Sequence, residues 1–490
     1  MTLLATVAMY AWLPALFVAF ALLPRRIAVT AAVTVGWCFL PCVSFRLYGL
    51  PDYTKVSATT VGTLLATLVF HTWIFTRFRL RLIDLPIILF CLSPFVSSMF
   101  NGLGWYDGVS TILNRTVLWG LPYFIGRLHF ERPGELRDLA VAMIVCGLLY
   151  VPLCLYEVRM SPQLHNTIYG FMQHDFRQHI RAGGWRPMVF MNHGLQVSLW
   201  LSACFVLTAG FWYFAGQRRI SIMRFAVPLL PIVIAFGVTL VLTKSLGALV
   251  LAIMALGCLF AARTLRARWP LMLPVIGCVF YLIGRGSGAW SAEVLIELAT
   301  MVNENRASSL EFRIMHESVL AEHARQQMFT GWGGWGRNRP VNEYGDDTTV
   351  ADGLWVLIFG MNGLFGLIPL YAALLGPPVA MISKLKRHHW GANPNGMIAA
   401  SVAMLCIMAT VDSLPNSMMM PIILTAIGAM AGIASNPRVA ADLELGMINQ
   451  QPRRRPRTRR AARPQNLTND PISPNRPRDA GPSLDGPSPV

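Results

Sequence analysis

The chain has 490 residues, of which 54% are hydrophobic and only 13% are charged, and its mean hydropathy is +0.49. Soluble domains carry about 25% charged residues, so a soluble fold of this size would lack the polar surface needed to cover its core. The formal net charge of +17 would favour nucleic acid as a partner if the basic side chains shared one folded surface, but they lie in short clusters between apolar runs and near the C-terminus. Composition therefore excludes a soluble fold and predicts an all-α polytopic membrane protein that binds no nucleic acid.

Thirteen apolar runs approach the roughly 20 residues that a membrane-spanning helix needs. In chain order we expect spans near residues 3–23, 27–45, 58–76, 82–100, 110–126, 138–156, 190–214, 225–243, 246–262, 269–285, 352–376, 396–414 and 417–434. The fifth run is the weakest, so the expected count is twelve or thirteen. The nine cysteines lie within or at the edges of these runs without any CxxC or Cys/His ligand spacing, so we expect no disulfides, no metal site and no cofactor.

Every second loop between the predicted spans is basic. These loops contain Arg25 and Arg26; Arg77, Arg79 and Arg81; Arg127, Arg132 and Arg137; Arg218, Arg219 and Arg224; Arg263, Arg266 and Arg268; and Lys384, Lys386 and Arg387. The positive-inside rule then puts these loops and the C-terminus in the cytoplasm and the N-terminus outside. Two long loops are also expected to lie outside, residues 157–189 (the first outer loop) and 286–351 (the second outer loop).

The sequence divides into a transmembrane domain, residues 1–435, and a tail, residues 436–490. The tail is rich in Pro, Arg, Asn and Ser and cannot bury a core, so we expect it to be disordered. Its segment QPRRRPRTRRAARP is predicted to lie on the anionic inner leaflet, at about 1 kcal/mol per basic residue near the surface.

The first outer loop ends in GGWRPMVFMNHG, which puts Arg186 and His193 at the mouth of the seventh span. Ionisable side chains at this depth are costly and favour a functional site, whereas the alternative is that Asn192 caps the helix. Lys244, in TKSLGAL, lies at the outer end of the eighth span, where snorkelling is the alternative interpretation.

The second outer loop contains a helical pattern over residues 306–328. At about 100° per residue, Arg306, Arg313, His316 and His323 share one face that would line a polar cleft, and the alternative is a solvated helix with scattered charge. The following GWGGWGRNRP is a weak phosphate-binding signal and more typical of a plain turn.

Four segments in order resemble elements of the O-antigen ligase and O-antigen polymerase superfamily. WRPMVFMNHG is similar to the family's Arg…His-Pro-Asn element, with Arg186 and His193 at the usual separation, and TKSLGALVLAIMALG to its Ser-Arg-Gly-Ala helix start. SSLEFRIMHESVLAEHARQQMFTGWGGWG is similar to the element that begins with an arginine, here Arg313. ADGLWVLIFGMNGLFGLIPL is similar to the His-Asn-x9-Gly-x-x-Gly element, with Gly363 and Gly366 at the glycines.

Two departures from the family pattern bear on the reaction. Asp352 stands where the ligase histidine is expected and Gly353 where the next asparagine is expected, while Leu246 replaces the arginine of the helix start, with Lys244 two positions away. The first departure disfavours a strict lipid-A-core ligase and favours a polymerase or another branch.

The resemblance implies a GT-C-like fold and a location in the inner membrane of a bacterium. It also implies metal-independent transfer of glycan from an undecaprenyl-pyrophosphate carrier to an acceptor sugar hydroxyl. Arginine forks suit a pyrophosphate leaving group, and the candidate donor-binding residues are Arg186, Arg313 and Arg306, with Lys244 in support. The attacking hydroxyl needs a base, for which the candidates are Asp352, His193 and His316. Desolvation at the end of a membrane helix would make the Asp352 carboxylate more basic.

Two other classes remain open. A transporter or flippase for a lipid-linked or polysaccharide substrate would carry ionisable groups at the membrane midplane, whereas the predicted spans are nearly free of charge. A membrane scaffold would use the basic tail to recruit a cytoplasmic partner.

Overall fold

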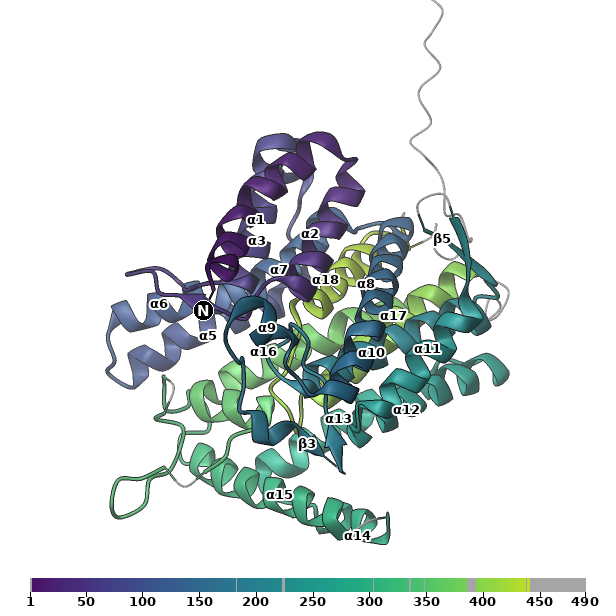
Figure 1. The fold of residues 1–490 in the computed structure, drawn as a ribbon. Coiled ribbons are helices and arrows are strands. Elements are labelled where there is room, and N and C mark those ends of the chain that lie inside the picture. Colours follow the sequence, from purple (N-terminus) through teal and green to yellow (C-terminus); the bar gives the residue numbers. More distant parts are fainter. Residues whose placement is uncertain are drawn as a thin grey trace, which may run out of the picture. The chain divides into compact units, whose positions relative to one another are not determined.

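The computed structural model describes residues 2–440 except 182, 223–224, 303, 335, 348, 386–393 and 438. The tail, apart from its first few positions, therefore lies outside the described residues, and the predictions of tail disorder and lipid contact remain predictions. The described part is mostly α-helical, as composition predicts, and its strands are limited to short hairpins (Figure 1).

The first half of the chain forms α1 (Leu3–Leu22), α2 (Arg25–Phe39), α3 (Lys55–Phe70), α4 (Trp73–Arg77), α5 (Leu85–Phe100), α6 (Trp105–Arg115), α7 (Leu121–His129), α8 (Pro133–Met160), α9 (Leu164–Tyr169) and α10 (Gly194–Ala209). Short 3-10 or π turns lie at η1 (Leu82–Asp84), η2 (Thr116–Gly120), η3 (Phe176–His179) and η4 (Gly210–Phe214).

The second half forms α11 (Leu229–Leu242), α12 (Leu246–Thr264), α13 (Trp269–Ser287), α14 (Glu293–Val302), α15 (Glu304–Arg325), α16 (Leu354–Lys384), α17 (Pro394–Asp412) and α18 (Pro421–Ser435). Three antiparallel pairs of short strands lie in loops: β1 (Ser44–Phe45) with β2 (Tyr53–Thr54), β3 (Ile180–Arg181) with β4 (Gly184–Trp185), and β5 (Arg219–Ile222) with β6 (Phe225–Pro228). The helix predicted for residues 306–328 is confirmed as α15.

Each of the thirteen predicted spans falls on helix, but they are not all of spanning length. Eight of the described helical segments, which include α1, α5, α8, α10, α12, α13, α16 and α17, are long and apolar enough to cross a membrane. Three more predicted spans are shorter apolar helices, α3, α11 and α18. The span predicted at 27–45 is α2, which has only 15 residues and begins with two arginines, and the span predicted at 110–126 is divided among α6, η2 and α7. The structure thus supports a multi-pass membrane protein, while the orientation of its termini stays a prediction.

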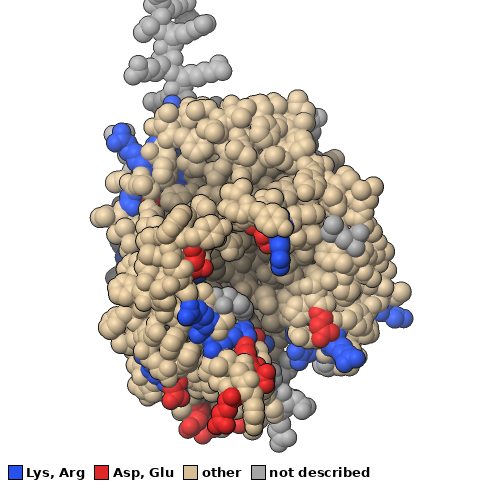
Figure 2. All heavy atoms as spheres, turned by 90° about the vertical axis from the view of Figure 1, so that its left-hand side faces the viewer, with Lys and Arg blue, Asp and Glu red and all other residues tan. Residues whose placement is uncertain are grey.

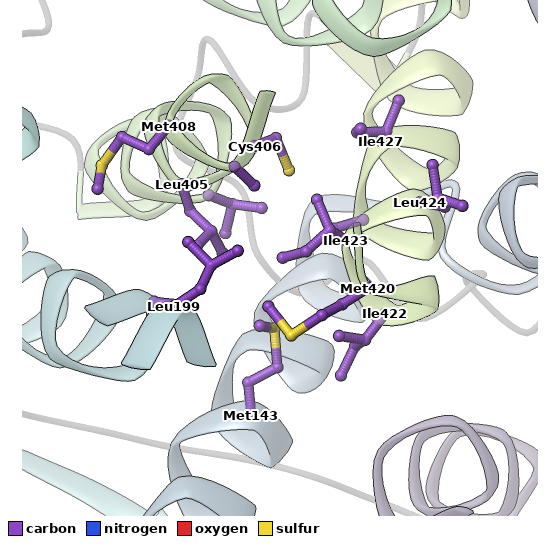
Figure 3. Packing of buried hydrophobic residues seen from close by; sticks show 14 of the residues in the cluster. Met143, Leu199, Leu405, Cys406, Met408, Met420, Ile422, Ile423, Leu424 and Ile427 are labelled. Carbon is purple, nitrogen blue, oxygen red and sulfur yellow. The ribbon is translucent and has the colours of Figure 1, made fainter. Parts of the chain in front are cut away.

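The core lies where α17 packs against its neighbours. Helix α17 contacts α8, α10, α12, α13, α16 and α18, and nearly all of its side chains are buried. Figure 3 shows Met143 of α8 and Leu199 of α10 on one side of this core, with Leu405 of α17 and Ile423 of α18 beside them. Because this helix has protein on every side, its sequence is apolar all round rather than amphipathic.

Helices α7 and α18 approach each other backbone to backbone. A Cβ added at Gly126 would lie 2.0 Å from the Thr425 carbonyl oxygen, and a Cβ added at Gly428 would lie 1.9 Å from the Tyr123 carbonyl oxygen. Small residues at such a contact allow the close van der Waals packing that holds membrane helices together.

Arg127, predicted as a cation of a cytoplasmic loop, is instead fully buried at the end of α7. Its guanidinium donates to both carboxylate oxygens of Asp84, at 2.7 and 3.0 Å, and Tyr123 donates its hydroxyl to the same carboxylate at 2.8 Å. A buried ion pair with its remaining lone pairs satisfied is stable only as a unit, so Arg127 fixes the η1 turn to α7.

Helix α16 is broken at Gly363, whose φ of 59° and ψ of −159° are non-helical. The segment after α15 crosses the break and supplies the missing partners. The N–H groups of Leu364 and Phe365 donate to the carbonyls of Met328 and Phe329 at 2.8 and 3.1 Å, and those of Trp332 and Gly333 donate to the carbonyls of Gly360 and Met361 at 2.8 and 3.0 Å. Irregular backbone at membrane depth is tolerated where protein satisfies it, and here the second outer loop does so.

The surface of the described part is largely apolar. In Figure 2 most of the visible face is free of charged side chains, and Lys, Arg, Asp and Glu gather around and below a hollow. A broad apolar surface is expected of a protein that contacts lipid.

Candidate functional site

Three of the predicted site residues converge at the start of α10. Arg186 follows the β3–β4 hairpin, His193 immediately precedes α10, and Lys244 lies in the turn between α11 and α12. A terminal guanidinium nitrogen of Arg186 lies 3.5 Å from the carbonyl oxygen of Lys244. The Arg186 side chain also packs over Gly194, where a Cβ would lie 2.5 Å from the arginine Cδ. Residues that are far apart in sequence therefore form one cationic cluster.

The turn that carries Lys244 has an uncommon backbone. Lys244 has a φ of 56°, in the left-handed region, which costs a residue with a Cβ about 1–2 kcal/mol. Its ammonium packs on the β3–β4 hairpin, because a Cβ added at Gly184 would lie 2.2 Å from the Lys244 Nζ. The strained turn thus holds the ammonium against the hairpin that leads to Arg186.

His193 is the residue that caps α10. Its Nδ1 accepts the backbone N–H of Leu195 at 3.0 Å, whereas Asn192, the predicted cap, donates its own backbone N–H to Gln196 at 3.2 Å. Because Nδ1 acts as an acceptor, the neutral imidazole carries its proton on Nε2. In this arrangement His193 offers a hydrogen-bond donor rather than the lone pair that a general base needs.

A second group of predicted residues forms around Arg313 of α15. Its Nη1 donates to the Asn416 side-chain oxygen at 3.0 Å and to the Pro415 carbonyl at 3.3 Å, and its Nε lies 3.6 Å from a carboxylate oxygen of Asp352. The Asp352 side chain is 43% exposed, so the desolvation expected of it is not seen. Asp352 does not cap α16 either, because Gly353 is the N-cap of this helix and no side chain caps it.

The other residues of the predicted polar face of α15 diverge. His316 accepts the Val350 backbone N–H on Nδ1 at 3.4 Å and packs on Phe312. His323 stacks on Trp332 with ring centroids 4.4 Å apart. Arg306 lies on α15, but its side chain is outside the described part of the chain. The structure therefore brings Arg313 and Asp352 together and gives His323 a packing role.

A buried network that the sequence did not reveal positions Arg313. Glu317, one turn along α15, accepts from Arg285 Nε at 3.0 Å, from the Tyr281 hydroxyl at 2.7 Å and from Trp355 Nε1 at 3.0 Å. These donors belong to α13 and α16, so a single carboxylate fastens α15 to two apolar helices. A small cavity of about 30 Å³ between Arg313, Glu317 and Asp352 lies beside this network.

A larger cavity of about 420 Å³ lies at the break of α16. Its wall includes Gly333 and Gly334 of the GWGGWG turn, Asn362, and Arg115 at the end of α6. Arg115 Nη2 donates to the Asn362 side-chain oxygen at 3.1 Å and its guanidinium lies 4.5 Å from the Phe90 ring centre, while Nη1 is buried without a hydrogen-bond partner among the described residues. Arg115 falls within a predicted span, so the sequence carried a signal for it: a cation inside an apolar run.

Three histidines cluster beside Arg186. A ring nitrogen from each of His174, His179 and His193 lies within 4.8 Å of the others. His179 is fully buried and neither of its nitrogens has a hydrogen-bond partner among the described residues. Burial, together with His174 and Arg186, lowers the pKa of His179 to about 4, so its imidazole is neutral at neutral pH. The spacing of these histidines matches no common ligand motif, which is why the sequence predicted no metal site.

Comparison with known proteins identifies no relative: no protein-family model and no curated protein matches the chain. The function is therefore argued from the site.

Proposed function

We propose that the chain is an envelope or exopolysaccharide polymerase or ligase, which transfers glycan from a polyprenyl-pyrophosphate carrier to an acceptor sugar hydroxyl at the outer face of a bacterial inner membrane. The resemblance of four sequence segments suggests this reaction. The structure supports it with one observation above all, the convergence of Arg186 and Lys244 at the end of apolar helices. A lipid-linked anion needs cations at the membrane surface, because its tail must stay in the bilayer.

In this proposal the cluster at the start of α10 binds the pyrophosphate. Arg186 is 4% exposed, and a buried guanidinium has a stronger interaction with an anion than one in water. His193 adds a neutral Nε2–H donor, and the N-terminus of α10 adds the positive end of a helix dipole. Stabilising the leaving pyrophosphate here lowers the barrier to transfer.

In this proposal the general base comes from the second group of residues, around Arg313. Asp352 remains the first candidate, because its carboxylate is accessible and is held by Arg313 through a loose 3.6 Å pair. An incoming phosphate would compete for Arg313 and release the carboxylate to accept a proton from the sugar hydroxyl. His316 is the second candidate, although its Nδ1 already accepts a backbone N–H.

A lipid analysis of cells that lack this chain tests the proposal. A transferase defect should cause lipid-linked glycan to accumulate at the outer face, where an added periplasmic glycosidase or periodate can reach it. Wild-type chain should clear the accumulated lipid, and the Arg186→Ala variant should not. A deletion strain with unchanged lipid-linked glycans would refute glycan transfer.

A transporter or flippase is the second candidate, and two structural features favour it. Helix α16 is broken within the apolar part of the chain, and Arg115 lies in the cavity at that break, as discontinuous helices and ionisable residues do in transporters. The same lipid analysis separates the two candidates, because loss of a flippase would leave the glycan at the inner face, protected from the added reagent.

A further inference from the structure

We propose that the side chains of His174, His179 and His193 bind one divalent transition-metal ion, and that this ion is Zn²⁺. This inference goes beyond glycan transfer, which needs no metal in the proposed reaction, and either proposal can fail without the other.

The first support is the geometry of the three rings. Their centroids are 4.6 Å apart for His174 and His193, 5.2 Å for His179 and His193, and 5.6 Å for His174 and His179. A tetrahedral zinc ion with bonds of about 2.0–2.1 Å needs donor nitrogens roughly 3.4 Å apart. The available nitrogens already lie within 4.8 Å of one another, so small inward movements of the rings complete the site.

The second support is the lack of protein partners. Both nitrogens of His179 and Nδ1 of His174 are buried without a hydrogen-bond partner among the described residues. Buried polar groups almost always have partners, and exceptions point to a water or an ion. His179 is 0% exposed, and the ring centroids of His174 and His193 lie 5.6 and 5.2 Å from its own. A metal ion would satisfy all three rings at once.

Two features disfavour metal binding and limit the expected affinity of the site. Arg186 and Arg181 lie close enough to exert positive potential on His179, and binding through Nε2 of His193 would give up the hydrogen bond from Leu195. One capping bond is a small part of the free energy of zinc coordination. We therefore expect a site weaker than a closed four-ligand structural zinc site, with its fourth position open to water or an anion.

A bound ion would tie the first outer loop to the start of α10. His174 lies two residues before η3 in that loop and His179 is the last residue of η3, whereas His193 precedes a helix that is almost wholly buried. In the metal-bound state His193 is a ligand, so the cations of the proposed donor site are Arg186 and Lys244. The ion would hold the hairpin, and with it Arg186, in place.

The test uses the full chain in detergent micelles, expressed without a polyhistidine tag and stripped with a chelator. Calorimetry with Zn²⁺ should give one ion per chain, and Co²⁺ should give the visible absorption of a four-coordinate site. His179→Gln and the less buried His174→Gln should each weaken binding by about tenfold or more. His323→Gln, the matched control, should bind as wild type, because His323 stacks on Trp332 away from the cluster.

Limited proteolysis gives a second readout. Arg177 and Arg181 are exposed trypsin sites on either side of His179, so Zn²⁺ should slow cleavage there in the wild type and in His323→Gln but not in His179→Gln. Failure of the wild type to bind Zn²⁺ or Co²⁺, or equal binding by all four chains, would overturn the proposal.

Discussion

Replacement of Gly363 by alanine should destabilise the whole chain, because the break in α16 can be built only with glycine at this position. The backbone at Gly363, with φ of 59° and ψ of −159°, lies in a region essentially reserved for glycine. A Cβ there would also lie 2.3 Å from both the carbonyl carbon and the carbonyl oxygen of Phe329. The neighbouring atoms are backbone, so no side-chain rotation can relieve the clash.

The magnitude follows from the two effects. Strain at such a φ and ψ costs about 1–3 kcal/mol. Moving the 328–333 segment away from α16 would weaken the four hydrogen bonds that join them, at about 0.5–1.5 kcal/mol each. With two of the four bonds lost, the total is about 4 kcal/mol. At about 2.1 cal/mol/K of unfolding entropy per residue, a chain of this length would melt about 4 °C lower.

The nine free cysteines provide the assay. Most of them are buried, so a thiol-reactive fluorophore reports thermal unfolding in detergent. Gly376→Ala is the matched control, because it lies in the same helix and a Cβ there meets no atom within 4 Å. If Gly363→Ala and Gly376→Ala had the same melting temperature, the contact between the second outer loop and α16 would contribute nothing to stability. The reasoning would then be wrong.

Three further predictions concern the site and the topology. Arg313→Ala and Arg186→Ala should each lower the rate of glycan transfer by about two orders of magnitude, and lysine at either position should restore little activity because it lacks the planar guanidinium. The transfer rates of the purified variants test this prediction. Full activity in both alanine variants would rule out the proposed donor site. Asp352→Asn should abolish chain extension while a lipid-linked donor still binds, since asparagine keeps the size and loses the proton acceptor; wild-type extension would move the search to His316. On a cysteine-free background, single cysteines in the loop 286–351 should react with a membrane-impermeant reagent in intact cells and cysteines in the tail should not; labelling of the tail would reverse the orientation.

The helices could be predicted because they depend on local composition. An apolar run of about 20 residues must be helical in a bilayer, and each of the thirteen predicted runs contains helix in the structure, although some begin or end outside it. Their lengths were harder to predict. The run at 110–126 looked like a single span, but Arg115 ends α6 there and η2 interrupts the path to α7. A hydropathy pattern cannot show that a cation inside a run turns toward Asn362 on another helix.

The site was predictable only in part, and for a related reason. Arg186 and Lys244 could be chosen from the sequence because cations beside apolar runs are few. The roles of the histidines depended on contacts that no spacing encodes: the lone pair of His193 Nδ1 is used by the Leu195 N–H, and His179 is buried against it. Glu317 was overlooked for the same reason, since its three donors come from two other helices.

The glycine contact between α7 and α18 limits how the protein can move. Two helices whose backbones touch at Gly126 and Gly428 cannot slide past each other by a fraction of a turn without a collision of main-chain atoms. The buried pair of Arg127 in α7 and Asp84 in η1 would leave two charges uncompensated if it opened, so the η1 turn stays attached to this end of α7. Helices α7 and α18 therefore behave as one rigid unit. Any separation of helices that admits a long lipid-linked chain must take place between other pairs of helices.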